Sequence, residues 1–224
     1  MAAADTLRLV FAPPHRAGMP FIIGGIVVCV IGLALAYWLA WLAGLFVLFC
    51  LYFFRDPERT APGRPGLLLA PADGKVVSVA PAVPPLELGL TPGTRWRVGI
   101  FLSLFDVHVN RVPADGTVTR IAYRHGTFLN ASFDRASDEN ERNAIAIRML
   151  GGREVAVVQI AGLVARRILC DLREGDVVRA GNRFGLIRFG SRTDLYLPEG
   201  IRPLVAEGQT MIGGETVIAD LTAS

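Results

Sequence analysis

Lysine, histidine and cysteine are scarce in this chain of 224 residues. Lys75 is the only lysine among 23 basic residues, and there are three histidines and three cysteines. The cysteines form no Cys-x-x-Cys pair, so we expect neither a metal site nor a disulfide framework, which fits a reducing compartment. The net charge is only +3, and no basic cluster is interleaved with aromatic residues, which argues against nucleic acid as a partner.

Charge is missing altogether from the segment 19–54, which contains no Asp, Glu, Lys, Arg or His. A single helix of about 35 residues would be ~52 Å long, well beyond the ~30 Å hydrocarbon core of a bilayer. We therefore expect a membrane hairpin of two short helices, with Tyr37, Trp38 and Trp41 near the interface. Each half is at the short end of the spanning range, so a hairpin that spans the bilayer and a re-entrant one both stay open.

Basic residues flank this apolar run on both sides and are absent from its middle; they are Arg8, His15, Arg16, Arg55, Arg59 and Arg64. The positive-inside rule then predicts that both ends, and the domain that follows, face the cytoplasm from the cell (inner) membrane. A cleaved secretory signal is the competing interpretation, but no small-residue cleavage site follows the run. The expected parts are a cytoplasmic N-terminal segment, the membrane hairpin, a Pro/Gly-rich linker and a catalytic domain, over 1–18, 19–54, 55–66 and 67–224.

The domain alternates short apolar runs with Gly, Pro and Asp, a pattern typical of an antiparallel, mainly β sandwich or barrel. The strand-sized runs are 75–80, 97–103, 116–124, 143–150, 154–162, 176–181, 183–190, 193–198 and 215–220. Only 162–172 is long enough for a useful helix. Two similar Gly-containing turns, at 173–181 and 206–214, suggest a fold related to lipoyl and biotinyl domains. Lys75 lacks the flanking signature of those carriers, so no carrier function is expected.

Three segments contain residue types that could perform chemistry: 70–76 with Asp73, 100–113 with His108, and 189–194 with Gly190 and Ser191. Taken singly, the three segments have ordinary explanations: the first as a turn, the second as a strand with a hydrogen-bonded histidine, and the third as a loop. Together, an Asp, a His and a Ser supply the parts needed to remove a proton from a hydroxyl. His15 precedes the membrane segment and His125 lies at an expected exposed turn, so His108 is the candidate base.

These segments resemble the phosphatidylserine decarboxylases, in particular their short bacterial form. The resemblance covers nearly the whole chain, and its motifs are YFFRDPER (52–59), PADGKV (71–76), FLSxxDVHxNRxP (101–113), NER (140–142) and RFGLIRFGSRTDxYLP (183–198). Each motif is moderately specific alone, and their order and spacing make the resemblance strong.

The resemblance implies that the chain cuts itself between Gly190 and Ser191. Ser191 Oγ would attack the Gly190 carbonyl, with His108 as base and Asp73 orienting it. Ser191 would become a covalent pyruvoyl (pyruvate) cofactor, and chains 1–190 and 191–224 would remain a heterodimer, with a higher oligomer left open. A Schiff base between this group and phosphatidylserine, a membrane phospholipid, would lead to phosphatidylethanolamine and carbon dioxide.

Three positions depart from the longer family members. Phe189 and Arg192 stand where those members have leucine and threonine, as in the short form, and Arg111 replaces a second histidine. Either His108 therefore serves both self-cleavage and decarboxylation, or an unidentified group takes one task. Arg111 is either a ligand of the substrate phosphate or carboxylate, or a surface charge.

Two other functions stay open on the residues alone. A membrane-bound serine hydrolase would use Ser191, His108 and Asp73 in an uncut chain. A non-catalytic scaffold or carrier would instead have a modified Lys75, or would lose no activity when Ser191 is replaced.

Overall fold

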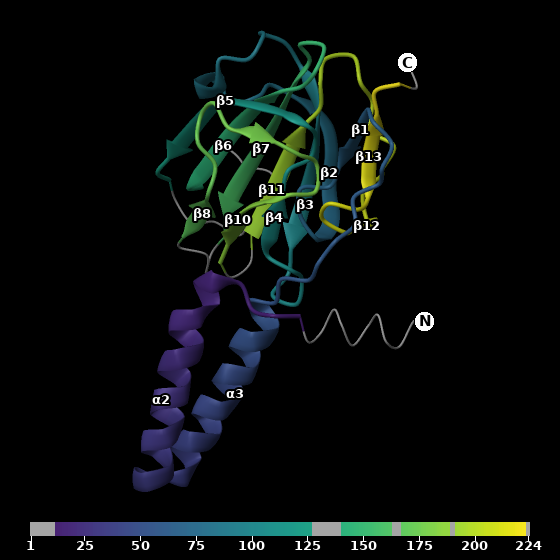
Figure 1. Cartoon of the computed structure of the whole chain (residues 1–224). Helices are drawn as coiled ribbons and strands as arrows, with labels where there is room; N and C mark the ends of the chain where they lie inside the picture. The colour runs from purple at the N-terminus through teal and green to yellow at the C-terminus, as the bar shows by residue number, and fades with distance from the viewer. Residues whose placement is uncertain (1–11, 127–139, 163–166, 189–190, 223–224) are drawn as a thin grey trace. The chain divides into compact units, whose positions relative to one another are not determined.

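The structure is a computed structural model that describes residues 12–126, 140–162, 167–188 and 191–222. The chain divides into two compact units, Met1–Glu58 and Arg59–Ser224. Within the described residues, the first contains two α-helices and the second contains the strands (Figure 1).

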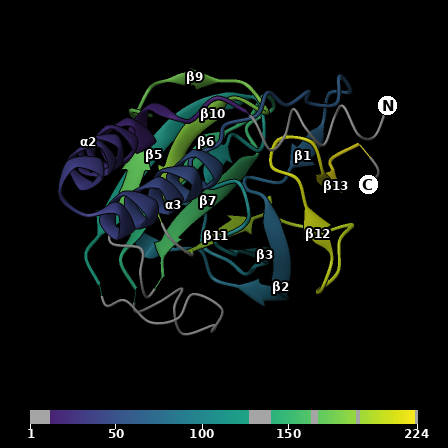
Figure 2. The ribbon, with the colours of Figure 1, turned by 90° about the horizontal axis from the view of Figure 1, so that it is seen from below.

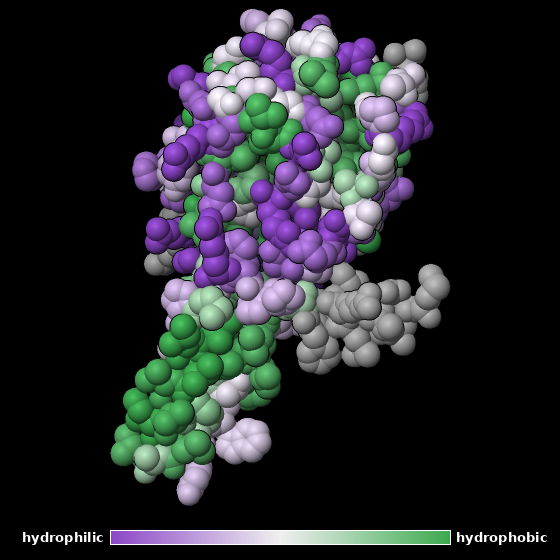
Figure 3. Space-filling model, in the orientation of Figure 1, coloured by the Kyte–Doolittle hydropathy of each residue, from purple (hydrophilic) through white to green (hydrophobic). Residues whose placement is uncertain are grey.

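The first unit is a pair of apolar helices, α2 (Met19–Leu35) and α3 (Tyr37–Phe53), preceded by the short 3-10 helix η1 (Arg16–Gly18). Ala36 breaks the helical run because its backbone is extended (φ −162°, ψ 111°). The segment Arg16–Leu35 has 20 residues and a mean hydropathy of 2.4, long and apolar enough to cross a membrane, whereas Tyr37–Phe53 is shorter. The face of the pair visible in Figure 3 is almost continuously hydrophobic.

Small residues allow the two helices to approach closely. A Cβ added at Gly32 would lie 2.6 Å from the backbone nitrogen of Ala40, and one at Gly25 would lie 2.6 Å from Val47. The Cys29 thiol donates a hydrogen bond to the Ala40 carbonyl at 3.4 Å. This use of glycine and alanine at the contact is typical of helices that pack within lipid.

The second unit is built from antiparallel strands in three sheets. Within the described residues the large sheet has the order β12-β2-β3-β11-β7-β6-β5-β9, and the small sheets are β4-β10-β8 and β1-β13. The strands are β1 (Leu67–Leu69), β2 (Gly74–Ala82), β3 (Arg95–Leu102), β4 (Val109–Arg111), β5 (Gly116–Arg124), β6 (Arg142–Arg148), β7 (Glu154–Ala161), β8 (Ile168–Cys170), β9 (Val177–Val178), β10 (Arg183–Ile187), β11 (Ser191–Tyr196), β12 (Thr210–Met211) and β13 (Val217–Asp220). Figure 2 shows that the large sheet is strongly curved.

The main hydrophobic core joins residues of the large sheet to residues of the small ones. Ile100 of β3, Val157 of β7 and Leu195 of β11 belong to one buried cluster with Phe184 of β10 and Ile218 of β13. A second cluster on the large sheet contains Tyr196 together with Leu88 of the 3-10 helix η2 (Leu86–Leu88). Both faces of the large sheet therefore carry buried side chains.

The mainly β, antiparallel prediction is confirmed. The helix considered over 162–172 is wrong at Ile168–Cys170, which forms β8, whereas 163–166 lie outside the described residues. The strand forms because β8 pairs with β10, with Leu169 opposite Leu186. A tertiary partner overrides the local preference of such a short segment.

We expect Gly185→Ala to destabilise the β10–β8 pair. The added Cβ would lie 2.1 Å from the Leu169 carbonyl oxygen, so the two backbones must separate. The expected loss in the free energy of unfolding is about 1–3 kcal/mol, measured by denaturant unfolding in detergent. Gly63→Ala, where a Cβ meets nothing within 4 Å, is the control. Equal stability of the two variants would contradict the expectation.

Candidate active site

Ser191 is the first residue of β11, in the middle of the large sheet. It pairs with Leu102 of β3 on one side and with Ala161 of β7 on the other. The residue is completely buried, and its Oγ has no hydrogen-bond partner among the described residues. An unsatisfied buried hydroxyl costs about 1–3 kcal/mol, which marks Ser191 as a functional candidate.

The chain crosses from one sheet to another immediately before Ser191. β10 belongs to the small sheet with β4 and β8, whereas β11 belongs to the large sheet. The expected cleavage site lies in this crossover, but Gly190 and Phe189 are outside the described residues.

His108 lies at the same crossover, at the end of the loop from β3 to β4. Its carbonyl accepts a hydrogen bond from Ile187 N at 3.4 Å, and Ile187 ends β10. The imidazole is fully buried, and Nδ1 lies 2.9 Å from the carbonyl oxygen of Asp106. Because a carbonyl only accepts, Nδ1 carries the proton in this contact, and Nε2 of a neutral ring is then the basic nitrogen.

Asp73 precedes β2 at the same end of the sheet. Its Oδ2 accepts a hydrogen bond from Arg59 at 2.8 Å, and its Oδ1 accepts one from Gly213 N at 2.7 Å. In the sheet order, β3 lies between β2 and β11, so the Asp73 turn is two strands from Ser191. The sheet thus brings Asp73, His108 and Ser191 to one end of the domain.

Arg111 is buried, whereas Lys75 is exposed. Arg111 is only 4% exposed and donates to the Gly181 carbonyl at 2.9 Å, so its interpretation as a surface charge is wrong. Its role as a substrate ligand stays a prediction. Lys75 is exposed on β2, opposite Thr210 and Phe101.

A buried ion pair directly follows Ser191. Arg192 and Asp194 are both fully buried and hydrogen-bonded through Nε and Oδ1 at 2.5 Å. Arg192 also donates to Ser78 Oγ at 3.2 Å, and Arg97 lies 3.9 Å from Asp194. Gly99 makes room for this guanidinium, because a Cβ there would lie 2.4 Å from it. Sequence reasoning missed this pair, although Arg-x-Asp inside an apolar strand run was the available signal.

A chain of amides ends at Thr193, on the strand that begins with the serine. Asn143 donates to Gln159 at 2.9 Å, Gln159 donates to Asn110 at 2.8 Å, and Asn110 donates to Thr193 at 3.5 Å. Thr193 is two residues after Ser191, on the same face of β11. Sequence reasoning also missed this chain, because its members come from four separate strands.

The Asn140-Glu141-Arg142 motif leads into β6, whose first residue is Arg142, near the same end of the sheet. Asn140 donates to the Ala161 carbonyl at 2.7 Å, and Ala161 faces Ser191. Glu141 accepts a hydrogen bond from Tyr123. Burial, as the larger cause, and this hydrogen bond, as the second, raise the pKa of the Tyr123 hydroxyl to about 12. The motif thus supports the backbone next to the candidate site.

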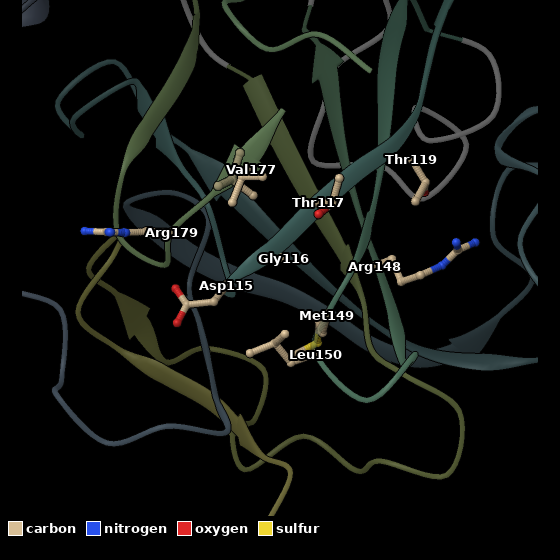
Figure 4. Close-up of a pocket in the computed structure, with 10 residues that line it drawn as sticks. Asp115, Gly116, Thr117, Thr119, Arg148, Met149, Leu150, Val177 and Arg179 are labelled. Atoms are coloured by element: carbon tan, nitrogen blue, oxygen red, sulfur yellow. The ribbon is translucent and has the colours of Figure 1, made fainter. Parts of the chain in front are cut away.

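A surface hollow of about 560 Å³ contains none of the candidate residues (Figure 4). It is lined by Asp115, Arg148 and Arg179 and by apolar groups that include Leu150. Arg148 is the last residue of β6. At the other end of β6, Arg142 pairs with Ile160, which is next to Ala161, the partner of Ser191. The six residues from Arg142 to Arg148 span about 20 Å at ~3.4 Å per residue, so the hollow lies that far along the sheet from the end that holds Ser191.

A buried serine and a buried imidazole at the same crossover between two sheets are residue types that enzymes with a serine nucleophile use. The model of the phosphatidylserine decarboxylase family matches residues 46–219. The chain is 71% identical, over 99% of its length and 91% of the relative's, to a phosphatidylserine decarboxylase proenzyme of Granulibacter bethesdensis. A protein of the same name from Gluconacetobacter diazotrophicus is 59% identical, over 99% of this chain and 100% of its own length. Another, from Cereibacter sphaeroides, is 56% identical, over 99% of this chain and 96% of its own length. The chain belongs to the phosphatidylserine decarboxylase family.

We expect Arg192→Ala to destabilise the domain by about 3–5 kcal/mol, because removing one partner of a buried ion pair leaves the other uncompensated. The measurement is denaturant unfolding in detergent, with Ser191→Ala as the background. The matched control is Arg64→Ala, which removes a 61% exposed partner of Asp220 and should cost less than about 1 kcal/mol. Similar losses for the two variants would show that the buried pair does not anchor β11.

Proposed function

We propose that this chain decarboxylates phosphatidylserine to phosphatidylethanolamine, using a pyruvoyl group made from Ser191 by self-cleavage after Gly190. The observation that carries the proposal is the buried Ser191 Oγ, which has no hydrogen-bond partner among the described residues and lies where the chain crosses between two sheets. The relatives named above are proenzymes, which supports a maturation step.

Cleavage begins when Ser191 Oγ attacks the Gly190 carbonyl and the acyl group moves from nitrogen to oxygen. His108 is the proposed base, because the Asp106 carbonyl keeps the proton on Nδ1, so Nε2 is the basic nitrogen of the neutral ring. Loss of the Cα proton of Ser191 then breaks the ester by elimination, giving dehydroalanine and a carboxylate on Gly190. Hydrolysis of the dehydroalanine releases ammonia and leaves a pyruvoyl group at the start of 191–224.

The sheet topology supports a cut at this point. β10 keeps its partners β4 and β8, all in the piece 1–190, and β11 keeps β3 and β7. Six residues of β11, Ser191–Tyr196, pair with each neighbour, and the β12–β2 and β13–β1 pairs also join 191–224 to the rest of the chain. The pieces 1–190 and 191–224 would therefore stay together as a heterodimer.

The environment of position 191 fits the pyruvoyl group. The site is buried, and maturation would remove its orphaned polar atom, because Oγ leaves with the Gly190 carboxylate and Cβ becomes the methyl group of the pyruvoyl, which needs no hydrogen-bond partner. When present, the group acts as the electron acceptor for loss of carbon dioxide from an amino acid headgroup. Thr193, held by Asn110, limits movement on the same face of β11, and burial excludes water.

His108 also serves as the proposed proton donor to the product, since no second histidine stands at Arg111. Asp73 is the proposed supporting carboxylate: since the Asp106 carbonyl holds Nδ1 of the imidazole, Asp73 acts through the turn on which it lies. Its bonds to Arg59 and Gly213 fix the turn at this end of the sheet.

The helical hairpin supports a membrane location suited to a lipid substrate. Arg16–Leu35 is apolar enough to span, and basic residues flank the hairpin at both ends. We propose that both ends, and the catalytic domain with them, face the cytoplasm from the inner membrane.

Replacement of the nucleophile tests self-cleavage. Purified protein should show two pieces by intact mass, with 191–224 blocked by a pyruvoyl group, whereas Ser191→Ala should give one uncut, inactive chain. An uncut wild-type chain that turns over ester substrates would instead support a serine hydrolase.

Replacement of the proposed base and its carboxylate forms a separate test. His108→Ala should reduce the cleavage rate at least about a hundredfold, the contribution typical of a general base. Asp73→Asn should also leave most of the chain uncut. The controls are His125→Ala, an 89% exposed imidazole, and Asp115→Asn, another carboxylate that accepts from a backbone N–H. Normal cleavage in both His108→Ala and Asp73→Asn would show that the base is elsewhere.

A further inference from the structure

We propose that the loop 103–107, which carries Leu104 and Phe105 at its tip, inserts into the surface of an anionic lipid bilayer. Leu104 is 42% exposed and Phe105 is 71% exposed, although both are large and apolar. The inference rests on the proposed function in one respect, that the substrate is a phospholipid held in a membrane.

The loop has a shape fixed by its own hydrogen bonds. Asp106 Oδ2 accepts from Ser103 N at 2.8 Å and from Ser103 Oγ at 2.7 Å. Asp106 N donates in return to the Ser103 carbonyl at 3.0 Å. A turn that satisfies its polar groups internally loses less free energy on entering an apolar phase. The exposed Leu104 and Phe105 side chains are therefore presented by a closed turn.

The candidate chemistry lies on both sides of this loop. Leu102, just before it, faces Ser191 across the β3–β11 ladder. His108, just after it, is held through Nδ1 by the Asp106 carbonyl, and Asp106 also closes the turn. A bilayer that receives Leu104 and Phe105 is thus brought to the end of the sheet where the headgroup must react.

Basic side chains lie on the segment that meets the end of this loop at His108. Arg188 follows Ile187, which donates to the His108 carbonyl, and Arg188 N donates to the carbonyl of the exposed Arg167 at 3.3 Å. Burial and, second, the charge of Arg167 lower the pKa of Arg188, so the two guanidinium groups interact electrostatically. Cations next to an apolar wedge match a surface of anionic headgroups over acyl chains. The bilayer is therefore the occupant that these groups fit.

The first experiment compares two physical forms of one headgroup. The full chain with Leu104→Ser and Phe105→Ser together is reconstituted in phosphatidylcholine/phosphatidylglycerol vesicles. It is assayed on phosphatidylserine in that bilayer and on dissolved short-chain phosphatidylserine. We expect kcat/KM to fall about tenfold, equivalent to about 1.4 kcal/mol, on the bilayer substrate only.

The matched control is Leu150→Ser, because Leu150 is 91% exposed and follows the far end of β6. This variant should leave both activities unchanged. Equal losses of activity of the double variant on the two substrates would indicate a structural role for the loop and overturn the proposal. No loss of activity on either substrate would also overturn it.

The second experiment needs neither cleavage nor turnover. Phe105→Cys and Leu150→Cys are each labelled with an environment-sensitive NBD dye in Ser191→Ala protein whose native cysteines are replaced by alanine. Emission at position 105 should shift to the blue in the vesicles, more with phosphatidylglycerol than without it, while position 150 should report water. Equal, water-like emission at both positions would overturn bilayer insertion. A blue shift at position 105, together with no decarboxylation by the chain with native Ser191 in the first experiment, would reject the proposed function alone.

Discussion

Every feature of the candidate site depends on the pairing of β11 between β3 and β7. Two antiparallel ladders, each covering Ser191–Tyr196, fix the strand from its first residue. A strand held by backbone hydrogen bonds on both sides does not need the chain that precedes it to stay in place. The same pairing therefore satisfies two needs of the proposed function: a rigid nucleophile before the cut and a retained small chain after it.

The alternation of side chains along β11 separates chemistry from anchoring. Ser191, Thr193 and Leu195 lie on one face, and Leu195 is part of the main core. Arg192 and Asp194 lie on the other face, with Tyr196 of the second cluster. A charge pair buried on that face contributes position rather than large net stability, since desolvation offsets much of its attraction. The residue next to Ser191 can thus hold the strand without entering the space around its hydroxyl.

The sequence predicted the long strands well and the short ones poorly. Periodicity placed β5 at 116–124 as the structure has it, and β2, β3, β6 and β7 within two residues at each end. β1, β4, β8 and β12 have only two or three residues each, too few for any period to show, and they form because a partner strand is present. For the candidate site, motifs gave Ser191, His108 and Asp73, but the Asp106 carbonyl at the imidazole is a backbone group that no residue pattern specifies.

Burial of Ser191 also bears on why an uncut chain would be inactive under the proposed function. A lipid headgroup cannot reach a side chain that is completely buried at the junction of two sheets. Under the proposed function, the cut after Gly190 would remove the covalent link between β10 and β11, and hydrolysis of the dehydroalanine that it leaves would give the reactive carbonyl. The two new chain ends are then held only by their own sheets, so they can separate without loss of any described ladder. Formation of the catalytic group and access to it would therefore follow from breaking one peptide bond.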